Sequence, residues 1–143
     1  MRAVFLDFGT VSSGDLDTGP LERVLPGIVL HERTAPLEVP ARIAGNEFVL
    51  ANKSVIDGAT IAANPQLRLV ALTATGVDNV DLAAARARDV AVCNLRDYCT
   101  DSVAQHVFAM LLALTHRVAE YDALVAGGRW QEAGQFSVFP YPI

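Results

Sequence analysis

The sequence has 143 residues, of which 52% are hydrophobic and 19% are charged, a composition that argues against a disordered chain. This length fits one domain and is sufficient to bury a hydrophobic core. The formal net charge is −5 and the basic residues are scattered along the chain. Nucleic acid is therefore excluded as a partner, because its recognition calls for clustered positive charge.

Cysteine use and hydropathy bear on the compartment. Cys93 and Cys99 are too few for a disulfide framework and lack metal-binding spacing, so we expect two reduced thiols and no metal site. The apolar run at 107–114 is too short to span a bilayer. Asp7 follows the first apolar run so closely that no signal peptide core can form. These features predict a soluble, cytoplasmic protein that does not bind membranes.

Five short apolar segments have the character of β-strands. They are rich in Val, Ile, Leu or Phe and nearly continuous, which is typical of strands covered on both faces. The predicted strands are Ala3–Leu6, Gly27–His31, Glu47–Ala51, Leu67–Leu72 and Val90–Asn94.

Helical segments alternate with these strands. We expect helices over Pro20–Leu25, Pro40–Ala44, Ile56–Asn64 and Leu82–Arg88, the last capped by Asp81. Strands that alternate with helices pair in parallel through right-handed crossovers. The sequence therefore predicts an α/β fold, a flavodoxin-like five-stranded parallel sheet of order 2-1-3-4-5 with helices on both faces.

The segment Asp101–Val125 differs from the earlier helical segments because it is long and contains no proline or glycine. The first glycine after it is Gly127. We expect a single helix there, with Ser102 and Gln105 at the spacing of a capping box. Its first half is apolar almost all round, and such a helix is buried on several sides. Another domain or a second copy of the chain must therefore cover it, and we expect a homodimer or a higher association through 101–125. After it, 127–143 is predicted to be an extended arm or a disordered end.

Three segments follow strand ends, where open parallel sheets bind ligands: 7–10, 52–54 and 73–79. Gly76 would let the backbone bend so that consecutive amides point at one anionic group. Lys53, one loop away, could supply positive charge. Taken alone, these residues are more simply explained as an ordinary turn and a solvated lysine.

The motifs resemble those of a known family when they are taken together. Asn52-Lys53 is followed by TGVDNVD at 75–81, by Asn94 and by YCTDSVAQH at 98–106, in matching order and spacing. They resemble the D-isomer-specific 2-hydroxyacid dehydrogenases, most closely the hydroxypyruvate reductase or glycerate dehydrogenase branch.

The resemblance implies a two-domain oxidoreductase that interconverts a 2-oxo acid and a D-2-hydroxy acid by hydride transfer with NAD or NADP. Residues 1–97 would be the substrate domain, 98–126 a hinge and crossover helix, and 127–143 an arm towards an absent nucleotide-binding domain. Lys53 and Thr75, Gly76 and Val77 would bind the substrate carboxylate. Thr100 and Val103 would lie against the cofactor.

The catalytic residues of the family would lie beyond Ile143, as would the glycine fingerprint, which is missing here. We therefore expect no catalytic residue, no bound cofactor and no turnover for this chain alone. His106 is expected to be a neutral histidine in a buried helix, and His31 and His116 to be surface residues. The identity of the 2-hydroxy acid and the choice between NAD and NADP stay open.

The alternative is a stand-alone flavodoxin-like binding or signalling module, such as a phospho-acceptor receiver domain. That chemistry needs clustered acids after the first strand and an acceptor aspartate after the third. Here the first strand is followed by Asp7 alone and the third by Asn52-Lys53, so the order is unfavourable.

Overall fold

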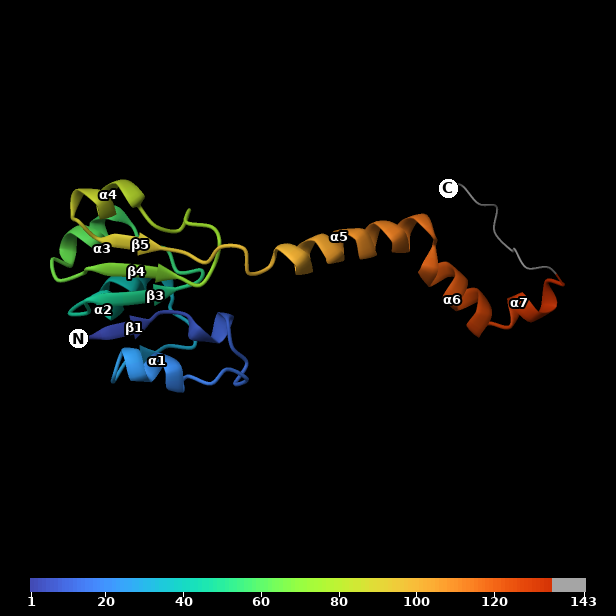
Figure 1. The fold of residues 1–143 in the computed structure, drawn as a ribbon, viewed down its shortest axis with the longest axis horizontal. Helices are drawn as coiled ribbons and strands as arrows, with labels where there is room; N and C mark the ends of the chain where they lie inside the picture. The colour runs from blue at the N-terminus through green and yellow to red at the C-terminus, as the bar shows by residue number, and fades with distance from the viewer. Residues whose placement is uncertain (135–143) are drawn as a thin grey trace. The chain divides into compact units, whose positions relative to one another are not determined.

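The computed structural model describes residues 1–134 and divides the chain into two compact units, 1–96 and 97–143. The first unit is an α/β domain (Figure 1). Its elements are β1 (Ala3–Phe5), α1 (Gly19–Val24), β2 (Val29–Leu30), α2 (Val39–Ile43), β3 (Phe48–Ala51), α3 (Gly58–Ala63), β4 (Leu69–Leu72), α4 (Leu82–Ala87) and β5 (Ala91–Cys93). Short 3-10 turns occupy Phe8–Thr10 and Pro36–Glu38.

The sheet has the predicted topology. Its order is β2-β1-β3-β4-β5, and every neighbouring pair is parallel. The register places Val4 beside Val49, Val49 beside Val70, and Val70 beside Val92. All five strands and the four helices between them occur where they were expected, with ends that differ by up to two residues at each boundary. The flavodoxin-like fold class is confirmed.

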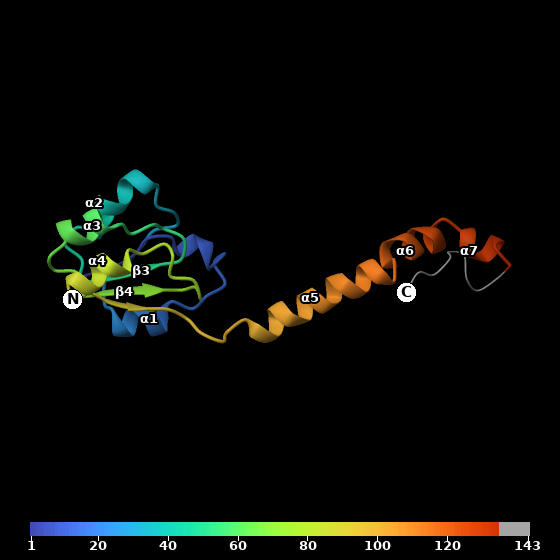
Figure 2. The ribbon, with the colours of Figure 1, turned by 90° about the horizontal axis from the view of Figure 1, so that it is seen from above.

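The core lies on one face of this sheet, beneath α2, α3 and α4, while α1 lies on the opposite face (Figure 2). Ile43 of α2, Ile61 of α3 and Ala85 of α4 pack in the same cluster as Val49 and Val70. Burial alternates along β3 and β4, which shows that their side chains are buried on one face of the sheet and only partly covered on the other.

The expectation that all strands are covered on both faces is therefore wrong for β3, β4 and β5. Phe48, Leu50, Leu69 and Ala71 are only half-buried, and Ala91 is exposed. A continuous apolar run predicts apolar side chains on both faces of a strand, but coverage depends on how many helices pack there.

Two aspartates cap helices in this unit. The carboxylate of Asp81 accepts the amide of Ala84 at 2.9 Å, as expected, and Asp57 accepts the amide of Thr60 at 2.8 Å. Asp57 shortens the third helix relative to the prediction. Ile56, just before it, instead forms an isolated parallel bridge with Val80.

The second unit contains α5 (Thr100–Thr115), α6 (Val118–Ala126) and α7 (Arg129–Glu132). The single helix expected over 101–125 is therefore wrong. Arg117 adopts a left-handed conformation with φ of 51°, which ends the first helix, and its guanidinium donates to the carboxylate of Glu120 in the first turn of the next. The sequence holds no glycine or proline there to indicate a break.

Two further expectations in this unit are corrected. The helix α5 begins at Thr100 after Cys99, with no side-chain cap, so Ser102 lies inside it and forms no capping box. Arg129–Glu132 form a short helix where an extended arm was predicted. The rest of that predicted arm, 135–143, lies outside the described residues.

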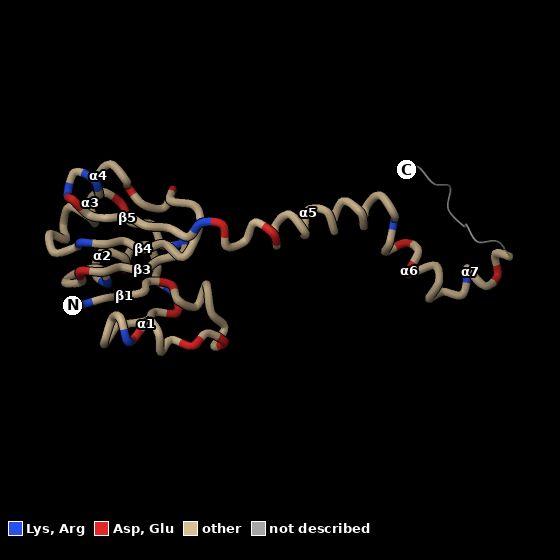
Figure 3. Tube along the Cα trace, in the orientation of Figure 1, with Lys and Arg blue, Asp and Glu red and all other residues tan. Residues whose placement is uncertain are grey.

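The surface of α5 is apolar. Between Asp101 and Arg117 the helix carries no charged residue (Figure 3), and its large hydrophobic side chains are at least half exposed within this unit. They are Val103, Val107, Phe108, Met110, Leu111, Leu112 and Leu114. His106 is exposed as well, rather than buried as expected.

Candidate functional site

Hydrogen bonds between loops build the candidate site at the carboxyl ends of the strands. The side-chain amide of Asn52, which follows β3, donates to Thr10 Oγ1 at 2.8 Å. The side-chain amide of Asn79, which follows β4, donates to the Ser54 carbonyl at 3.0 Å. Asn94, after β5, donates its Nδ2 to the Thr75 carbonyl at 2.7 Å. Loops that follow four different strands are thereby held together at one edge of the sheet.

A hollow of about 290 Å³ lies between the loops that follow β3 and β4. Its lining residues are Asn52, Lys53, Val55, Ala74, Gly76, Asp78 and Asn79. Lys53 is exposed and is the only lysine in the sequence. No ion pair among residues 1–134 involves it, so its charge is available to a ligand. The structure thus brings Lys53 and Gly76 to one hollow, as the sequence predicted.

The backbone amides of Gly76 and Val77 have no acceptor within residues 1–134. They are therefore free to donate to a ligand. Gly76 does not have a positive φ, so its backbone conformation does not require glycine. A Cβ there would lie 2.8 Å from Asp78 Oδ1, the end of an exposed side chain that can move aside.

Thr75 and Val77 flank this glycine with different environments. Thr75 is exposed and its carbonyl is bound by Asn94, whereas Val77 is half-buried and packs against the hydrophobic core. The core contact of Val77 and the bond to Thr75 fix the backbone on both sides of Gly76. The backbone that carries the unpaired amides of Gly76 and Val77 is therefore held in place by contacts on both sides.

The two residues expected near a cofactor, Thr100 and Val103, belong to the second unit. Both lie in the first turn of α5 and both are exposed. Their contact with a nicotinamide stays a prediction.

Sequence reasoning placed Asp7 in one of the three loops at strand ends, but did not single it out as a functional candidate. This side chain is 3% exposed, and its carboxylate accepts four hydrogen bonds from residues 52–54. The available signal was an acidic residue directly after an apolar strand, but only the fold shows which donors meet it. These bonds also oppose the receiver alternative, because the oxygens of Asp7 are already occupied by protein donors.

A second hollow, of about 250 Å³, lies on the other side of the same loop. It shares Lys53 and Val55 with the first and adds Arg33 and Thr34 among its lining residues. The side chain of Arg42 bonds to the Arg33 carbonyl at 2.6 Å and to Thr34 Oγ1 at 2.7 Å, which orders that wall. Residues 53–55 therefore lie between two hollows at the same edge of the sheet.

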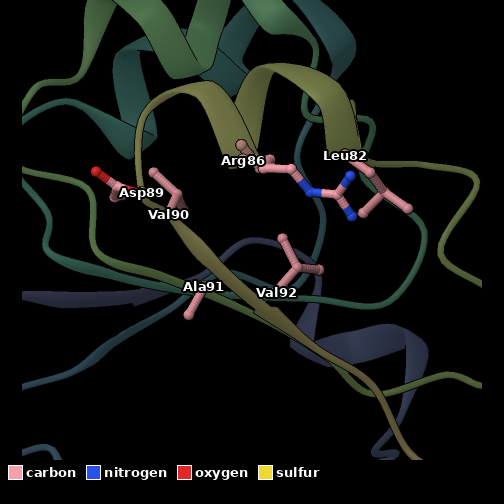
Figure 4. Close-up of a pocket in the computed structure, with 7 residues that line it drawn as sticks. Leu82, Arg86, Asp89, Val90, Ala91 and Val92 are labelled. Carbon is pink, nitrogen blue, oxygen red and sulfur yellow. The ribbon is translucent and has the colours of Figure 1, made fainter.

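A further hollow, of about 480 Å³, lies elsewhere, between α4 and the edge strand β5 (Figure 4). Leu82, Val90 and Val92 supply apolar surface there, and Arg86 extends over it. None of its lining residues belongs to the two hollows described above. A large volume is not by itself a reason to place the candidate ligand site in this hollow.

Within residues 1–134, no group of three His, Cys, Asp or Glu side chains is placed to hold a metal ion. No helix in this range is long and apolar enough to cross a membrane. Cys93 and Cys99 are both free thiols.

Comparison with known proteins now decides the family. Residues 17–129 match the family model described as D-isomer specific 2-hydroxyacid dehydrogenase, catalytic domain. The chain belongs to this family. It is 38% identical over 108 residues to the glycerate dehydrogenase of Methylorubrum extorquens, covering 76% of this chain and 34% of that protein.

A second relative spans the whole chain. The hydroxypyruvate reductase of Blautia hydrogenotrophica is 32% identical over 146 aligned residues, which cover 100% of this chain and 45% of that protein. The chain thus spans between a third and a half of the length of these relatives. Both names agree with the branch that the sequence motifs resemble.

Solved structures show the same fold. A 2-hydroxyacid dehydrogenase from Ketogulonicigenium vulgare matches with a TM-score of 0.74 at 24% identity, covering 99% of this chain and 44% of that one. An acyclic imino acid reductase in complex with NADPH and D-Arg matches with a TM-score of 0.78 at 17% identity, covering 98% and 43%. At these identities the likeness extends to the fold alone.

Proposed function

We propose that this 2-hydroxyacid dehydrogenase family member is the substrate-binding domain of an NAD(P)-dependent oxidoreductase that interconverts a 2-oxo acid and a D-2-hydroxy acid. The observation that carries the proposal is the hollow where Lys53 meets Gly76, with the unpaired amides of Gly76 and Val77 beside it. Family membership and the two named relatives support the reaction class.

The hollow suits a small carboxylate. Amide donors and an ammonium group each form charge-assisted hydrogen bonds to carboxylate oxygens, and such bonds are stronger than neutral ones. Asp78 also lines the hollow, and its negative charge opposes an anionic ligand. Lys53 therefore offsets Asp78 as well as attracting the substrate, which makes it the residue on which binding depends most.

In the proposed enzyme, the bound cofactor would supply the hydride for reduction of the 2-oxo acid as NADH or NADPH, and would accept it from the 2-hydroxy acid as NAD or NADP. The role of this chain is to bind and orient the acid, with Thr75 holding the turn and with Thr100 and Val103 contacting the cofactor. We place no catalytic residue in this chain and propose that the 143 residues alone give no turnover. The substrate domain would comprise 1–97, and 98–126 would form the hinge and crossover.

We also propose that the family member acts as a cytoplasmic homodimer associated through α5. Seven large apolar side chains on this helix are at least half exposed, and burial of such surface is the main drive for association. The free thiols of Cys93 and Cys99 are in keeping with a reducing compartment.

Titration of the ¹⁵N-labelled chain with D-glycerate, followed by NMR, tests the carboxylate site. The amide signals of Gly76 and Val77 should shift and saturate, whereas sodium chloride at equal ionic strength should leave them unchanged. Lys53→Met should weaken binding about tenfold, equivalent to about 1.4 kcal/mol for a charged hydrogen bond. Arg68→Met, which removes an exposed cation outside the hollow, should leave the affinity unchanged.

Two results would refute the assignment. The first is saturable binding that leaves the signals of residues 75–77 unmoved. The second is an equal loss of affinity in both variants, since that would mean that overall charge, and not Lys53, attracts the acid. Turnover of NADH with hydroxypyruvate by the 143-residue chain would separately refute the proposal that the chain alone is inactive.

A further inference from the structure

The loop after β3 folds around the side chain of Asp7. The amide of Asn52 donates to Asp7 Oδ1 at 2.8 Å, and the amides of Lys53 and Ser54 each donate to Oδ2 at 2.7 Å. The hydroxyl of Ser54 adds a fourth bond to Oδ2 at 2.9 Å. Three consecutive backbone amides and one hydroxyl thus converge on one carboxylate.

This arrangement is an internal anion site. Successive amides that point at one centre form a concavity that binds anions, and here the anion belongs to the protein. A buried charge is costly unless donors replace its water, and these four bonds provide that replacement. No ion pair among residues 1–134 involves Asp7, so the loop is its principal compensation.

The same loop carries the cation of the candidate site. Lys53 lines both hollows, and its own amide is one of the three held by Asp7. Thr10 accepts a bond from the side chain of Asn52, and Asn79 donates to the carbonyls of Asn52 and Ser54, but neither bonds to Lys53. Within residues 1–134, only Asp7 bonds to all three of the residues 52–54.

We propose that Asp7 is a positioning residue. Its carboxylate fills the anion site formed by residues 52–54 and thereby holds Lys53 beside Gly76. This inference rests on the proposed function for its consequence in substrate binding, but the internal anion site stands independently of it. Removal of the carboxylate should leave an empty site that has the shape of a carboxylate and favours a negative charge. A small carboxylate such as formate can enter this site.

The experiment uses the 143-residue chain as wild type, Asp7→Ala and Ile61→Val. The last is a control that weakens the core at α3, away from the loop. Thermal unfolding is measured in sodium formate and in sodium chloride at equal ionic strength. Formate should raise the midpoint of Asp7→Ala relative to chloride by more than it raises that of the other two proteins, in which any gain comes from binding in the Lys53–Gly76 hollow.

Amide signals in NMR spectra separate this inference from the proposed function. In Asp7→Ala, formate should shift the amides of residues 52–54, which in wild type are occupied by Asp7. The affinity of Asp7→Ala for D-glycerate, measured without formate, should fall about tenfold, while Ile61→Val keeps the wild-type affinity. If the wild-type chain binds no D-glycerate, the proposed function is refuted. The formate response of Asp7→Ala then decides whether the internal anion site exists.

The remaining outcomes are equally decisive. A folded Asp7→Ala whose formate response does not exceed that of wild type overturns the internal anion site, and a folded Asp7→Ala with unchanged glycerate affinity overturns the positioning role. If Asp7→Ala is unfolded in chloride, formate should promote its folding. Should it stay unfolded in formate, Asp7→Asn decides the matter, because it keeps the shape but exchanges one acceptor oxygen for a donor. A glycerate affinity equal to that of wild type in Asp7→Asn would then overturn the proposal.

Discussion

Replacement of Ile56 by alanine should destabilise the first unit strongly, because this residue ties the candidate loop to the core. Ile56 is 0% exposed, and its backbone bonds to Asn79 and Asp81 at 2.8 and 3.1 Å. The substitution deletes three carbons, worth about 0.8 kcal/mol each in transfer free energy, and leaves a cavity besides. The free energy of unfolding should therefore fall by about 3–4 kcal/mol.

The assay must report on the correct unit. The tryptophan and all three tyrosines lie after residue 97, so intrinsic fluorescence follows the second unit only. Urea unfolding is better followed by the NMR amide signals of β3 and β4. Leu37→Ala is the matched control, since it also deletes three carbons, but from a side chain that is 96% exposed. Its effect should stay within about 0.5 kcal/mol.

The reasoning would be refuted if Ile56→Ala cost less than about 1 kcal/mol, or if the two variants were equally destabilised. Either result would mean that the buried position of Ile56 does not contribute to the stability of the unit. The slope of the unfolding free energy against urea should remain unchanged in both variants, because neither alters the surface exposed on unfolding appreciably.

Three further predictions concern pH and association. Hydrogen bonds from Thr60 hold the pKa of Asp57 below its ordinary value of 3.8, so the stability lost in Asp57→Ala should be constant near neutral pH and shrink as the pH falls below 3.8; a difference independent of pH would contradict this. Burial, reinforced by the charge of Arg42, lowers the pKa of His31, so its imidazole NMR signals should titrate with a midpoint below 6.5, and Arg42→Met should raise that midpoint. Phe108→Asp on α5 should convert the proposed dimer into a monomer in sedimentation velocity, because it places a charge in the apolar surface; identical sedimentation of both proteins would argue against association through this helix.

Much of the first unit could be predicted from local sequence. Short apolar runs separated by helical segments specify parallel pairing, because only crossovers can join parallel neighbours. The cap at Asp81 was predicted for the same local reason, since capping involves a side chain and amides within three residues. The meeting of Lys53 and Gly76 followed from the rule that strand ends share one edge of the sheet.

Other features depend on contacts that local patterns do not encode. The break at Arg117 requires a left-handed residue without the glycine that commonly indicates one. Its nearby contact with Glu120 is compatible equally with a continuous helix, because residues three apart are neighbours on a helix surface. The pattern of apolar residues therefore predicted one helix where the chain forms two.

The sequence by itself determined the family, the order of the strands and the loops that carry the candidate site. Only the tertiary structure decided that Asp7, which lies 45 to 47 residues before its partners, is enclosed by the amides of residues 52–54. It also decided which face of β3, β4 and β5 is covered within the described residues. The physical reason is the same in both cases: periodicity reports which side chains are apolar or polar, while burial and pairing depend on what the folded chain brings against them.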